Sequence, residues 1–386
     1  MQTDPRSLQR WNLISDFKEM LKDCAPEAPP HSSWSDPNRK LAAAEYLSLF
    51  LFGLLNPTVR TMQGLCAASR LPRVQAEICA RPVSLGSFSA AQHVLDPGLL
   101  EKIFAQLGAR LGATQPSGPG PAGGPRWLIR DSTLWAALPR MTWAFWRAQG
   151  PNQNAVRLHV SLHVLEDSPA GAQVGLGAGC ERKVWQETWR QGEGYIGDRY
   201  FGEDYRLFAL LAEKGCSYVI RLRQNASIHV EEELPVSAQD QAAGVLRQAW
   251  ARLGCRKSYR SARVRLVWVQ GPQEALLLVT NHSAEELSAA LVSQLYRQRW
   301  QVELFFRWIK CILGCRHWLA ESPAGVAAQI YLALIAALLL QLYSGQRPTR
   351  RMMELIQFYL QGVASLEDLE RGLARERARA KNKKKK

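Results

Sequence analysis

The sequence lacks any apolar run long enough to cross a membrane. Its most apolar segments, Leu47–Leu55 and Ile330–Leu340, are 9 and 11 residues long, whereas a membrane-spanning helix needs about 20. Residues 1–30 carry scattered charges and no apolar core of the signal-peptide type. We therefore expect a cytoplasmic protein with no membrane partner, in which Ile330–Leu340 belongs to a buried core helix.

Paired cysteines at zinc-binding spacing are also missing. The eight cysteines are scattered along the chain, and only Cys311 and Cys315 lie close together. A structural zinc site needs a second such pair, so we expect free thiols in a reducing compartment. Gly175–Gly179 is glycine-rich, but no Lys-Ser or Lys-Thr follows it, which argues against a phosphate-binding loop.

Acidic residues are scarce relative to basic ones. The chain has 34 Asp and Glu against 49 Lys and Arg, and its formal charge is +15 at pH 7. A globular chain this basic usually binds a polyanion, first of all nucleic acid, although a solvated basic face gives the same count. Nine of the basic residues lie in Arg371–Lys386, beside a single acid. Such a tail is usually disordered and binds polyanions without specificity, or only keeps the chain soluble.

The chain divides into segments of different composition. Residues 1–112 place apolar residues at helical spacing, and Asn56-Pro57 and Asp96-Pro97 are helix-start signals. Residues 113–125 are rich in proline and glycine, as linkers are. We expect a helical N-terminal domain over 1–112, which binds DNA or only packs on the rest, and a linker over 113–125. An α/β domain over 126–343 and a C-terminal helical segment with a basic tail over 344–386 follow.

Residues 126–343 alternate between strand-like and helix-like patterns. Arg157–Leu165 alternates apolar and polar residues, which is typical of a half-buried strand with His159 and His163 on its exposed face. The order of elements predicts the α/β class, with a mixed sheet and flanking helices. Further strands are expected at Ser217–Arg223, Arg263–Val269 and Ala275–Thr280, and long helices at Ser283–Leu313 and Gly325–Tyr343.

One stretch of the long helix, residues 295–310, combines aromatic, basic and acidic side chains. With 100° of rotation per residue, four of them fall within a stripe about 60° wide. A solvated face with an Arg299–Glu303 pair at i,i+4 would give part of this pattern. A carboxylate flanked by basic and aromatic groups also suits a site that handles phosphates and a metal ion. The four residues are Tyr296, Arg299, Glu303 and Lys310.

A magnesium site needs more than one carboxylate, and two aspartates follow short apolar strands. Asp131 comes after Trp127–Ile129 in the sequence RDST, and Asp198 comes after Tyr195 in GDRYF. Either aspartate alone could equally be a turn or cap residue. Four other acids are rivals, but none of them ends an apolar strand. They are Glu187, Glu193, Glu203 and Asp204.

These motifs resemble those of a known family. The spacing Tyr296-x2-Arg299-x3-Glu303-x6-Lys310 resembles the YREK signature of insertion-sequence DDE transposases. Asp131 and Asp198 resemble the first and second catalytic aspartates of that family. The similarity extends over about residues 40–343, and supporting segments lie at 83–97, 218–225 and 325–340.

The resemblance implies an RNase H-like fold with a β-rich insertion at about residues 225–282. Asp131, Asp198 and Glu303 would be the catalytic residues and would bind two Mg²⁺ or Mn²⁺ ions, so that the enzyme cleaves DNA strands and transfers them. It implies DNA partners, namely the terminal inverted repeats and target DNA, a homodimer on DNA, and a prokaryotic, nucleoid-associated location. The DNA-binding residues would be Tyr296, Arg299, Lys310 and Trp268.

Two departures from the family pattern stand out. Ser132 follows the first aspartate, where the family often has glycine, and residues 269–295 contain no aromatic residue to stack on a flipped base. Trp268, just before this range, is the best candidate for that stacking. Because the range itself has no aromatic residue, the sequence leaves open whether a DNA hairpin intermediate forms. Two alternatives to a transposase are a metal-dependent nuclease of the same fold and a catalytically silent DNA-binding descendant.

Overall fold

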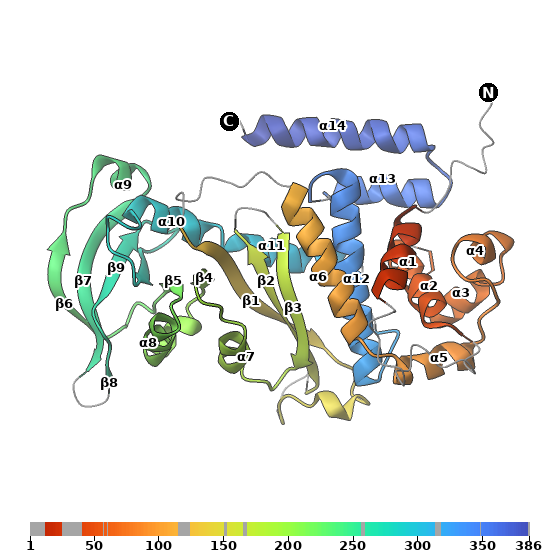
Figure 1. The fold of residues 1–386 in the computed structure, drawn as a ribbon, viewed down its shortest axis with the longest axis horizontal. Coiled ribbons are helices and arrows are strands. Elements are labelled where there is room, and N and C mark those ends of the chain that lie inside the picture. The colour runs from red at the N-terminus through yellow and green to blue at the C-terminus, as the bar shows by residue number, and fades with distance from the viewer. Residues whose placement is uncertain are drawn as a thin grey trace. The chain divides into compact units, whose positions relative to one another are not determined.

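The computed structural model describes residues 12–24, 41–56, 58–59, 61–114, 124–149, 153–164, 168–255, 259–312, 318–347 and 349–384. The chain forms two compact units. The first unit contains residues 1–111, 135–156 and 306–386 and is mainly helical. The second unit contains residues 112–134 and 157–305 and carries most of the sheet (Figure 1). Most of the expected linker, residues 115–123, lies outside the described residues, as does Cys315.

A single mixed sheet dominates the second unit. Its strand order is β3-β2-β1-β4-β5-β10-β9-β7-β6, with β8 paired to β7. β1, β4 and β5 are parallel neighbours, whereas the pairs from β5–β10 onward are antiparallel. The predicted α/β class is confirmed, and the block β3-β2-β1-β4-β5 has the strand order of an RNase H-like core. The strands are β1 (Arg126–Ala136), β2 (Ala155–His163), β3 (Ser168–Leu176), β4 (Glu193–Gly197), β5 (Ser217–Arg221), β6 (Ile228–Leu234), β7 (Val245–Cys255), β8 (Tyr259–Arg260), β9 (Val264–Val269) and β10 (Leu276–Thr280).

Short helices cover one face of β4 and β5 with aromatic side chains. Trp185 packs on Phe201 with ring centroids 4.1 Å apart, and Phe208 stacks on Tyr218 at 5.3 Å. All four side chains are almost fully buried, and burying such rings is the main favourable term in holding helices on a sheet. The helical elements of this unit are α7 (Glu181–Glu187), η4 (Phe201–Glu203), α8 (Arg206–Glu213), α9 (Ala238–Ala242) and α10 (Ala289–Arg297). The unit boundary falls within α11 (Trp300–Arg307), after Phe305.

The predicted strand at Arg157–Leu165 is confirmed as β2, but the prediction that it is half-buried is wrong. His159 and His163, expected on a solvated face, are only 4% and 8% exposed. β2 is an inner strand between β1 and β3, and both of its faces are covered. Burial and the nearby charges of Arg130 and Arg157 lower the pKa of His159 to about 4.

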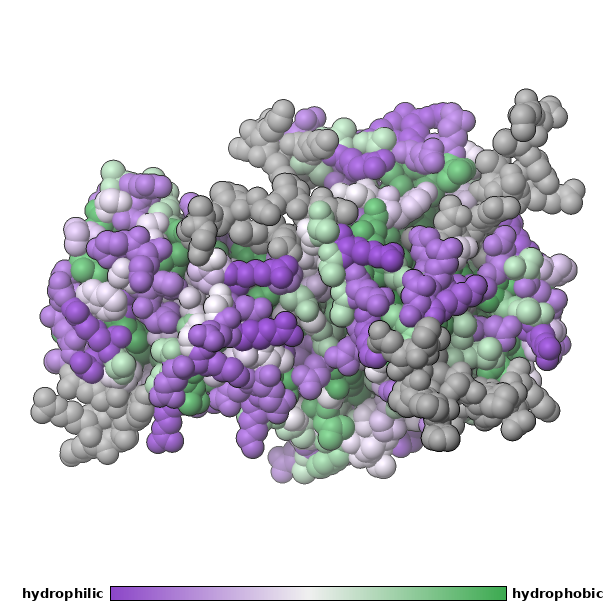
Figure 2. Space-filling model, viewed as in Figure 1, coloured by the Kyte–Doolittle hydropathy of each residue, from purple (hydrophilic) through white to green (hydrophobic). Residues whose placement is uncertain are grey.

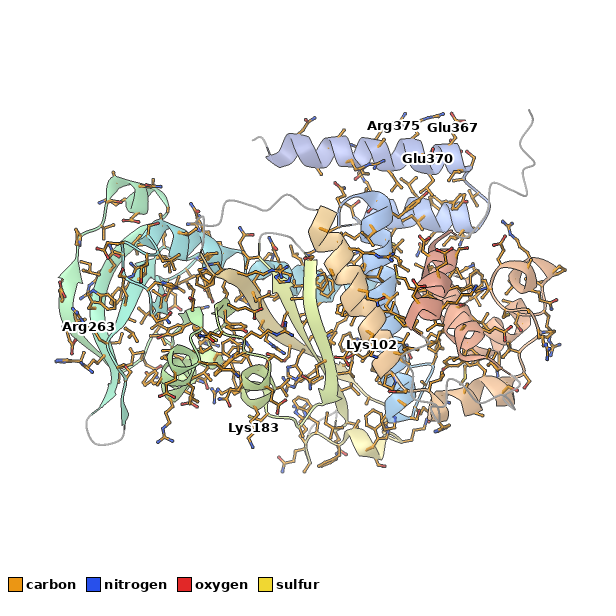
Figure 3. The ribbon with its side chains drawn as sticks, in the orientation of Figure 1. Lys102, Lys183, Arg263, Glu367, Glu370 and Arg375 are labelled. Atoms are coloured by element: carbon orange, nitrogen blue, oxygen red, sulfur yellow. The ribbon has the colours of Figure 1, made fainter. Side chains whose placement is uncertain are left out.

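The region expected to be β-rich continues the core sheet. The strands predicted at Arg263–Val269 and Ala275–Thr280 are present as β9 and β10. The edge strand β6 is lined with glutamates that pair with arginines of β7 and its neighbours, for example Glu233 with Arg247. Arg263 extends from this end of the sheet (Figure 3). Charged side chains on an exposed edge discourage pairing with strands of other molecules.

The first unit is built around one apolar helix, α12. By length and composition this 22-residue helix could cross a membrane, but 89% of its apolar window is buried, so the predicted core helix is confirmed. α12 packs on α2 and α5, and Tyr46 of α2 meets Phe88 of α5 with ring centroids 4.7 Å apart. The elements of this unit are α1 (Asn12–Cys24), α2 (Ala43–Leu55), α3 (Met62–Ala68), α4 (Pro72–Glu77), α5 (Leu85–Val94), α6 (Gly98–Thr114), η3 (Thr142–Ala144), η5 (Trp308–Ile312), α12 (Pro323–Ser344), α13 (Arg350–Leu360) and α14 (Leu366–Lys384).

The basic tail is helical as far as Lys384, contrary to the expectation of disorder. α14 packs along α13 (Figure 1), and it buries Leu369 and Leu373 to 1% and 2% exposure. Acidic and basic residues of α14, including Glu367, Glu370 and Arg375, project from the helix (Figure 3), and hydrophilic residues are frequent on the face of the molecule that Figure 2 shows. An apolar stripe and pairs such as Glu367–Arg371 at i,i+4 favour helix, which a charge count alone does not reveal.

Candidate active site

Asp131 of β1 and Asp198, the residue after the parallel neighbour strand β4, lie near each other. In the β1–β4 pairing Arg126 is opposite Glu193, and Ile129 is opposite Ile196. Both aspartates come two residues after that last pair, and the charge of Asp198 acts on the carboxyl of Asp131, so the two side chains lie near each other. Neighbouring strands are about 4.8 Å apart. The expectation that Asp131 ends its strand is wrong, because β1 continues to Ala136, but the pairing with β4 ends just before it.

The carboxyl group of Asp131 is largely withdrawn from solvent and lies near a second carboxylate. Burial is the main cause that raises its pKa to about 7, and the charge of Asp198 adds to the effect. The backbone N–H of Ser132, which donates to Oδ1 at 2.8 Å, and the charge of Arg299 act in the opposite direction. Asp198 follows β4 directly, and its Oδ1 accepts a hydrogen bond from the backbone N–H of Tyr200 at 2.9 Å.

The third predicted acid, Glu303, is on a short helix rather than on one long helix. The predicted helix at Ser283–Leu313 is interrupted: α10 ends at Arg297, and α11 begins at Trp300. In the turn between them Arg299 N–H donates to Tyr296 C=O, an i→i+3 bond that tightens the backbone. A π-helix, η5, follows α11. The predicted stripe on a single helix is therefore wrong, and its four residues lie on four successive backbone segments.

Arg299 connects two of the predicted acids. Its guanidinium pairs with Asp131 Oδ2 at 3.3 Å and with Glu303 Oε1. The Arg299 and Asp131 side chains are each 19% exposed, and Glu303 is 35% exposed. Glu303 is thus linked to Asp131 indirectly, because both carboxylates pair with Arg299, a residue predicted to contact DNA.

Tyr296 also lies at this site but is buried. Its side chain is 8% exposed, and burial raises the pKa of its hydroxyl, against the lowering effect of Arg299 and Arg221. The β4–β5 register, with Gly197 opposite Ile220, places Arg221 next to Asp198. The aspartates are therefore bordered by two arginines and a tyrosine.

The contacts given for Lys310 and Trp268 are with residues other than the three predicted acids. Lys310 belongs to the first unit, where its ammonium group lies 4.6 Å from the centre of the Trp135 ring. Trp268 is on β9, three strands along the sheet from β4, and the guanidinium of Arg247 covers its ring at 4.5 Å. Their roles in DNA binding stay predictions.

Three residues at the site were missed by sequence reasoning: Ser132, Arg157 and Glu181. Glu181 begins α7, and its pKa is raised by burial and by the charge of Asp198. No motif marks it, because it comes near the aspartates only once β2 and α7 have packed. Of the rival acids, Glu193 accepts from the hydroxyl of Tyr195, Glu203 pairs with Arg182 and Arg223, and Asp204 accepts from Arg206 N–H.

The donors present suit a divalent cation in part. Carboxylate oxygens are the ligands that Mg²⁺ and Mn²⁺ prefer, and the nearness of Asp198 to the carboxyl of Asp131 fits a cation between them. Within the described ranges, no three His, Cys, Asp or Glu side chains are grouped closely enough to hold one metal ion. Two of the three predicted ligands lie together, whereas the third is held by Arg299.

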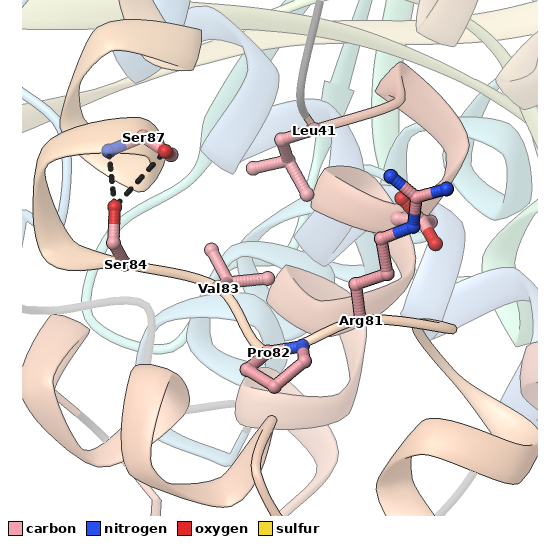
Figure 4. A pocket seen from close by; sticks show the side chains of 7 residues that line it. Leu41, Arg81, Pro82, Val83, Ser84 and Ser87 are labelled. Atoms are coloured by element: carbon pink, nitrogen blue, oxygen red, sulfur yellow. Dashed lines mark hydrogen bonds between the residues drawn. The ribbon is translucent and has the colours of Figure 1, made fainter.

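A cavity of about 470 Å³ in the helical unit contains none of these residues. It is lined by Leu41, Glu45, Arg81, Pro82, Val83, Ser84 and Ser87 (Figure 4). Ser84 caps α5 by accepting from Ser87 N–H at 3.1 Å. Because it lies in the first unit, whereas the aspartates lie in the second, we assign it no part in the candidate site.

Comparison with known families decides the classification. The model of the family described as the transposase DDE domain matches residues 122–339, more than half of the chain. The chain belongs to this family. The matched range contains all three predicted acids, Asp131, Asp198 and Glu303, so sequence similarity to insertion-sequence transposases is confirmed at the level of the DDE domain.

Individual relatives agree with this classification. The chain is 25% identical over 215 residues to a probable transposase for insertion sequence element IS5377 from Geobacillus stearothermophilus. That alignment covers 55% of each protein, so the chain spans about half the length of this relative. It is 23% identical over 338 residues to a protein described as a transposase for insertion sequence element IS4SA from Synechocystis sp., with 86% of this chain and 89% of that one covered.

A solved structure of piggyBac transposase in a synaptic complex with hairpin DNA was also matched. The alignment covers 97% of this chain and 82% of that chain, at 13% identity and a TM-score of 0.40. A similarity of that size carries no argument about this fold or its ligands. The classification therefore rests on the family match and the sequence relatives.

Proposed function

We propose that the chain is a DNA transposase of an insertion element, which cleaves DNA strands and transfers them to new sites. The observation that carries this proposal is that Asp131 of β1 and Asp198, which follows the neighbouring strand β4, lie near each other inside the matched DDE domain. Two partly buried carboxylates near each other repel unless a cation joins them. A site that binds a divalent cation would offset that repulsion.

Asp131, Asp198 and Glu303 would hold Mg²⁺ or Mn²⁺, and a pair of such ions supplies an activated water and stabilises charge at the leaving oxygen. The sheet fixes the two aspartates, whereas the turn before α11 sets the direction of Glu303. Glu303 has to leave Arg299 in order to join the aspartates.

The finer assignment to the YREK signature is part of the proposal. Arg299 has a planar fork of donors that matches phosphate oxygens as well as carboxylates, so it suits contacts to the DNA backbone once Asp131 and Glu303 have other partners. Tyr296 lies beside it and would support it. Lys310 and Trp268 complete the proposed DNA contacts, the latter by stacking on a base.

The proposed partners are the terminal inverted repeats of the element and target DNA, bound by a homodimer. The net charge of +15 supports a polyanionic partner. Phosphate contacts by arginine and lysine make such binding strongly dependent on salt. Binding that weakens steeply between low and moderate salt is therefore expected.

Cleavage of labelled duplex DNA that carries the sequences flanking the gene tests the function. We expect cuts that need Mg²⁺ or Mn²⁺ and that are lost in Glu303→Gln, while DNA binding is kept. Glu354→Gln is the matched control, because Glu354 also pairs with an arginine at i,i+4 but lies on α13.

Three other results would contradict the proposal, each in a different way. Cleavage without joining of strands indicates a nuclease of the same fold. DNA binding without cleavage in the unsubstituted chain indicates a silent descendant. Cleavage that survives Glu303→Gln means that the acids are wrongly assigned.

A further inference from the structure

A partly buried ion pair between Arg157 of β2 and Glu181 of α7 lies next to Ser132, the residue after the first aspartate. Nη1 of Arg157 donates to Glu181 Oε2 at 3.1 Å, and Nη2 of Arg157 donates to Gly177 C=O at 3.2 Å. The two side chains are only 15% and 14% exposed. Because a buried arginine with several acceptors has little freedom, Arg157 is held in one position.

Ser132 connects this ion pair to Asp131. Its hydroxyl accepts a hydrogen bond from Arg157 Nη1 at 2.9 Å and lies within hydrogen-bonding reach of Glu181. Its backbone N–H donates to Asp131 Oδ1 at 2.8 Å. One residue thus joins the carboxylate of Asp131 to the Arg157–Glu181 pair, through its side chain on one side and its main chain on the other.

The same serine is the position at which the sequence departs from the family pattern. A glycine there would keep the backbone N–H but would have no hydroxyl to accept from Arg157. In this chain the added hydroxyl of Ser132 accepts from the same Arg157 nitrogen that donates to Glu181.

A purely structural pair would explain part of this arrangement. Arg157 and Glu181 could serve only to attach α7 to β2, and the charge of Glu181 could serve only to neutralise Arg157. Neither role requires a hydrogen bond from Arg157 to the hydroxyl of Ser132, the residue that follows the proposed metal ligand Asp131. Outer groups that orient a ligand commonly change metal affinity about 10- to 100-fold when they are removed.

We propose that Glu181 is a positioning residue of the active site: it holds Arg157 against Ser132, and Ser132 in turn holds the carboxylate of Asp131 towards Asp198. This inference rests on the proposed function, because it takes Asp131 as a metal ligand. It adds three residues, Ser132, Arg157 and Glu181, to those that the family motifs indicate.

Mn²⁺ binding to the full-length chain without DNA, followed by electron paramagnetic resonance of the free ion, tests the proposal. Ser132→Ala changes no charge and removes only the hydroxyl, so we expect about tenfold weaker binding. Glu181→Gln is expected to weaken binding similarly, and the double variant no more than the stronger single variant, because both act through one chain of contacts. Thermal unfolding shows whether each variant is folded.

The matched control is Glu231→Gln, since Glu231 also pairs with arginines in the same unit but lies on β6. Binding within twofold of the parent chain in folded Ser132→Ala overturns the proposal. The proposal is also overturned if Glu181→Gln weakens Mn²⁺ binding while Ser132→Ala does not, because Glu181 then acts through its charge and not through Ser132.

A further variant separates this inference from the proposed function. If Asp131→Asn leaves Mn²⁺ binding unchanged, the metal site itself is wrongly placed and both proposals fail. If Asp131→Asn abolishes binding while Ser132→Ala does not alter it, the metal site stands and only the positioning role fails.

Discussion

Replacing Arg299 should strengthen metal binding and weaken DNA binding at the same time. In the DNA-free chain the guanidinium of Arg299 pairs with Asp131 and Glu303, so a cation that uses these carboxylates has to displace it. Arg299→Gln removes the competing positive charge while keeping a side chain of similar length. The same variant removes a proposed contact to DNA phosphates, which should lower DNA affinity.

The size of the effect follows from the two contacts. A hydrogen bond to a charged group contributes about 1.5–3 kcal/mol when it is buried, but these side chains are 19–35% exposed, and solvent screening reduces the value. About 1–2 kcal/mol in total is a reasonable cost of displacing Arg299. Since 1.4 kcal/mol corresponds to a factor of ten, Arg299→Gln should bind Mn²⁺ about 5- to 30-fold more tightly.

Titration with Mn²⁺ in the absence of DNA measures this effect, and a salt-controlled gel-shift assay measures DNA affinity. Arg350→Gln is the matched control, because Arg350 pairs with a glutamate at i,i+4 but lies on α13, and it should change Mn²⁺ affinity by less than twofold. Equal or weaker Mn²⁺ binding in Arg299→Gln would refute the reasoning, because Arg299 would then support the metal site rather than compete with it.

Two further predictions concern stability, measured by urea unfolding. The pKa of His159 is about 4 in the fold against about 6.5 in an unfolded chain, so the unfolded state binds more protons below pH 6.5. The free energy of unfolding should fall as pH is lowered, by about 2 kcal/mol at pH 5, and this component should be missing in His159→Gln. A Cβ at Gly202 would lie 2.1 Å from Arg221 C=O, so Gly202→Ala should cost about 1–3 kcal/mol. Gly171→Ala, which meets nothing within 4 Å, should cost less than 1 kcal/mol.

The sequence predicted that Asp131 and Asp198 act together, and the structure places them near each other, whereas their catalytic role stays a prediction. Each was selected because it comes after a short apolar run, and helical spacing predicted the Arg299–Glu303 pair. The nearness of the aspartates depends on how β1 and β4 align, and no local pattern encodes that alignment. The Arg299–Asp131 pair depends on the break before α11, in a segment with neither proline nor glycine to indicate it.

The sequence also did not show which side chains are buried. Alternation in Arg157–Leu165 correctly grouped His159 and His163 on one face of β2. Periodicity shows which residues share a face, but it does not show whether that face is covered by other elements. For the same reason the sequence did not indicate Glu181, because its neighbours Ser132, Arg157 and Asp198 come from distant parts of the chain.

The continuity of the sheet has a mechanical consequence for DNA recognition. Because β10, β9, β7 and β6 are hydrogen-bonded in series to β5 and β4, the insertion cannot swing as a separate arm. A strand spacing of about 4.8 Å sets Trp268 on β9 about 14 Å from the strand that precedes Asp198. That interval corresponds to roughly four base-pair steps at about 3.4 Å each. Under the proposed function, the sheet would therefore hold a scissile phosphate near Asp198 at a fixed distance from any DNA contact made by β9.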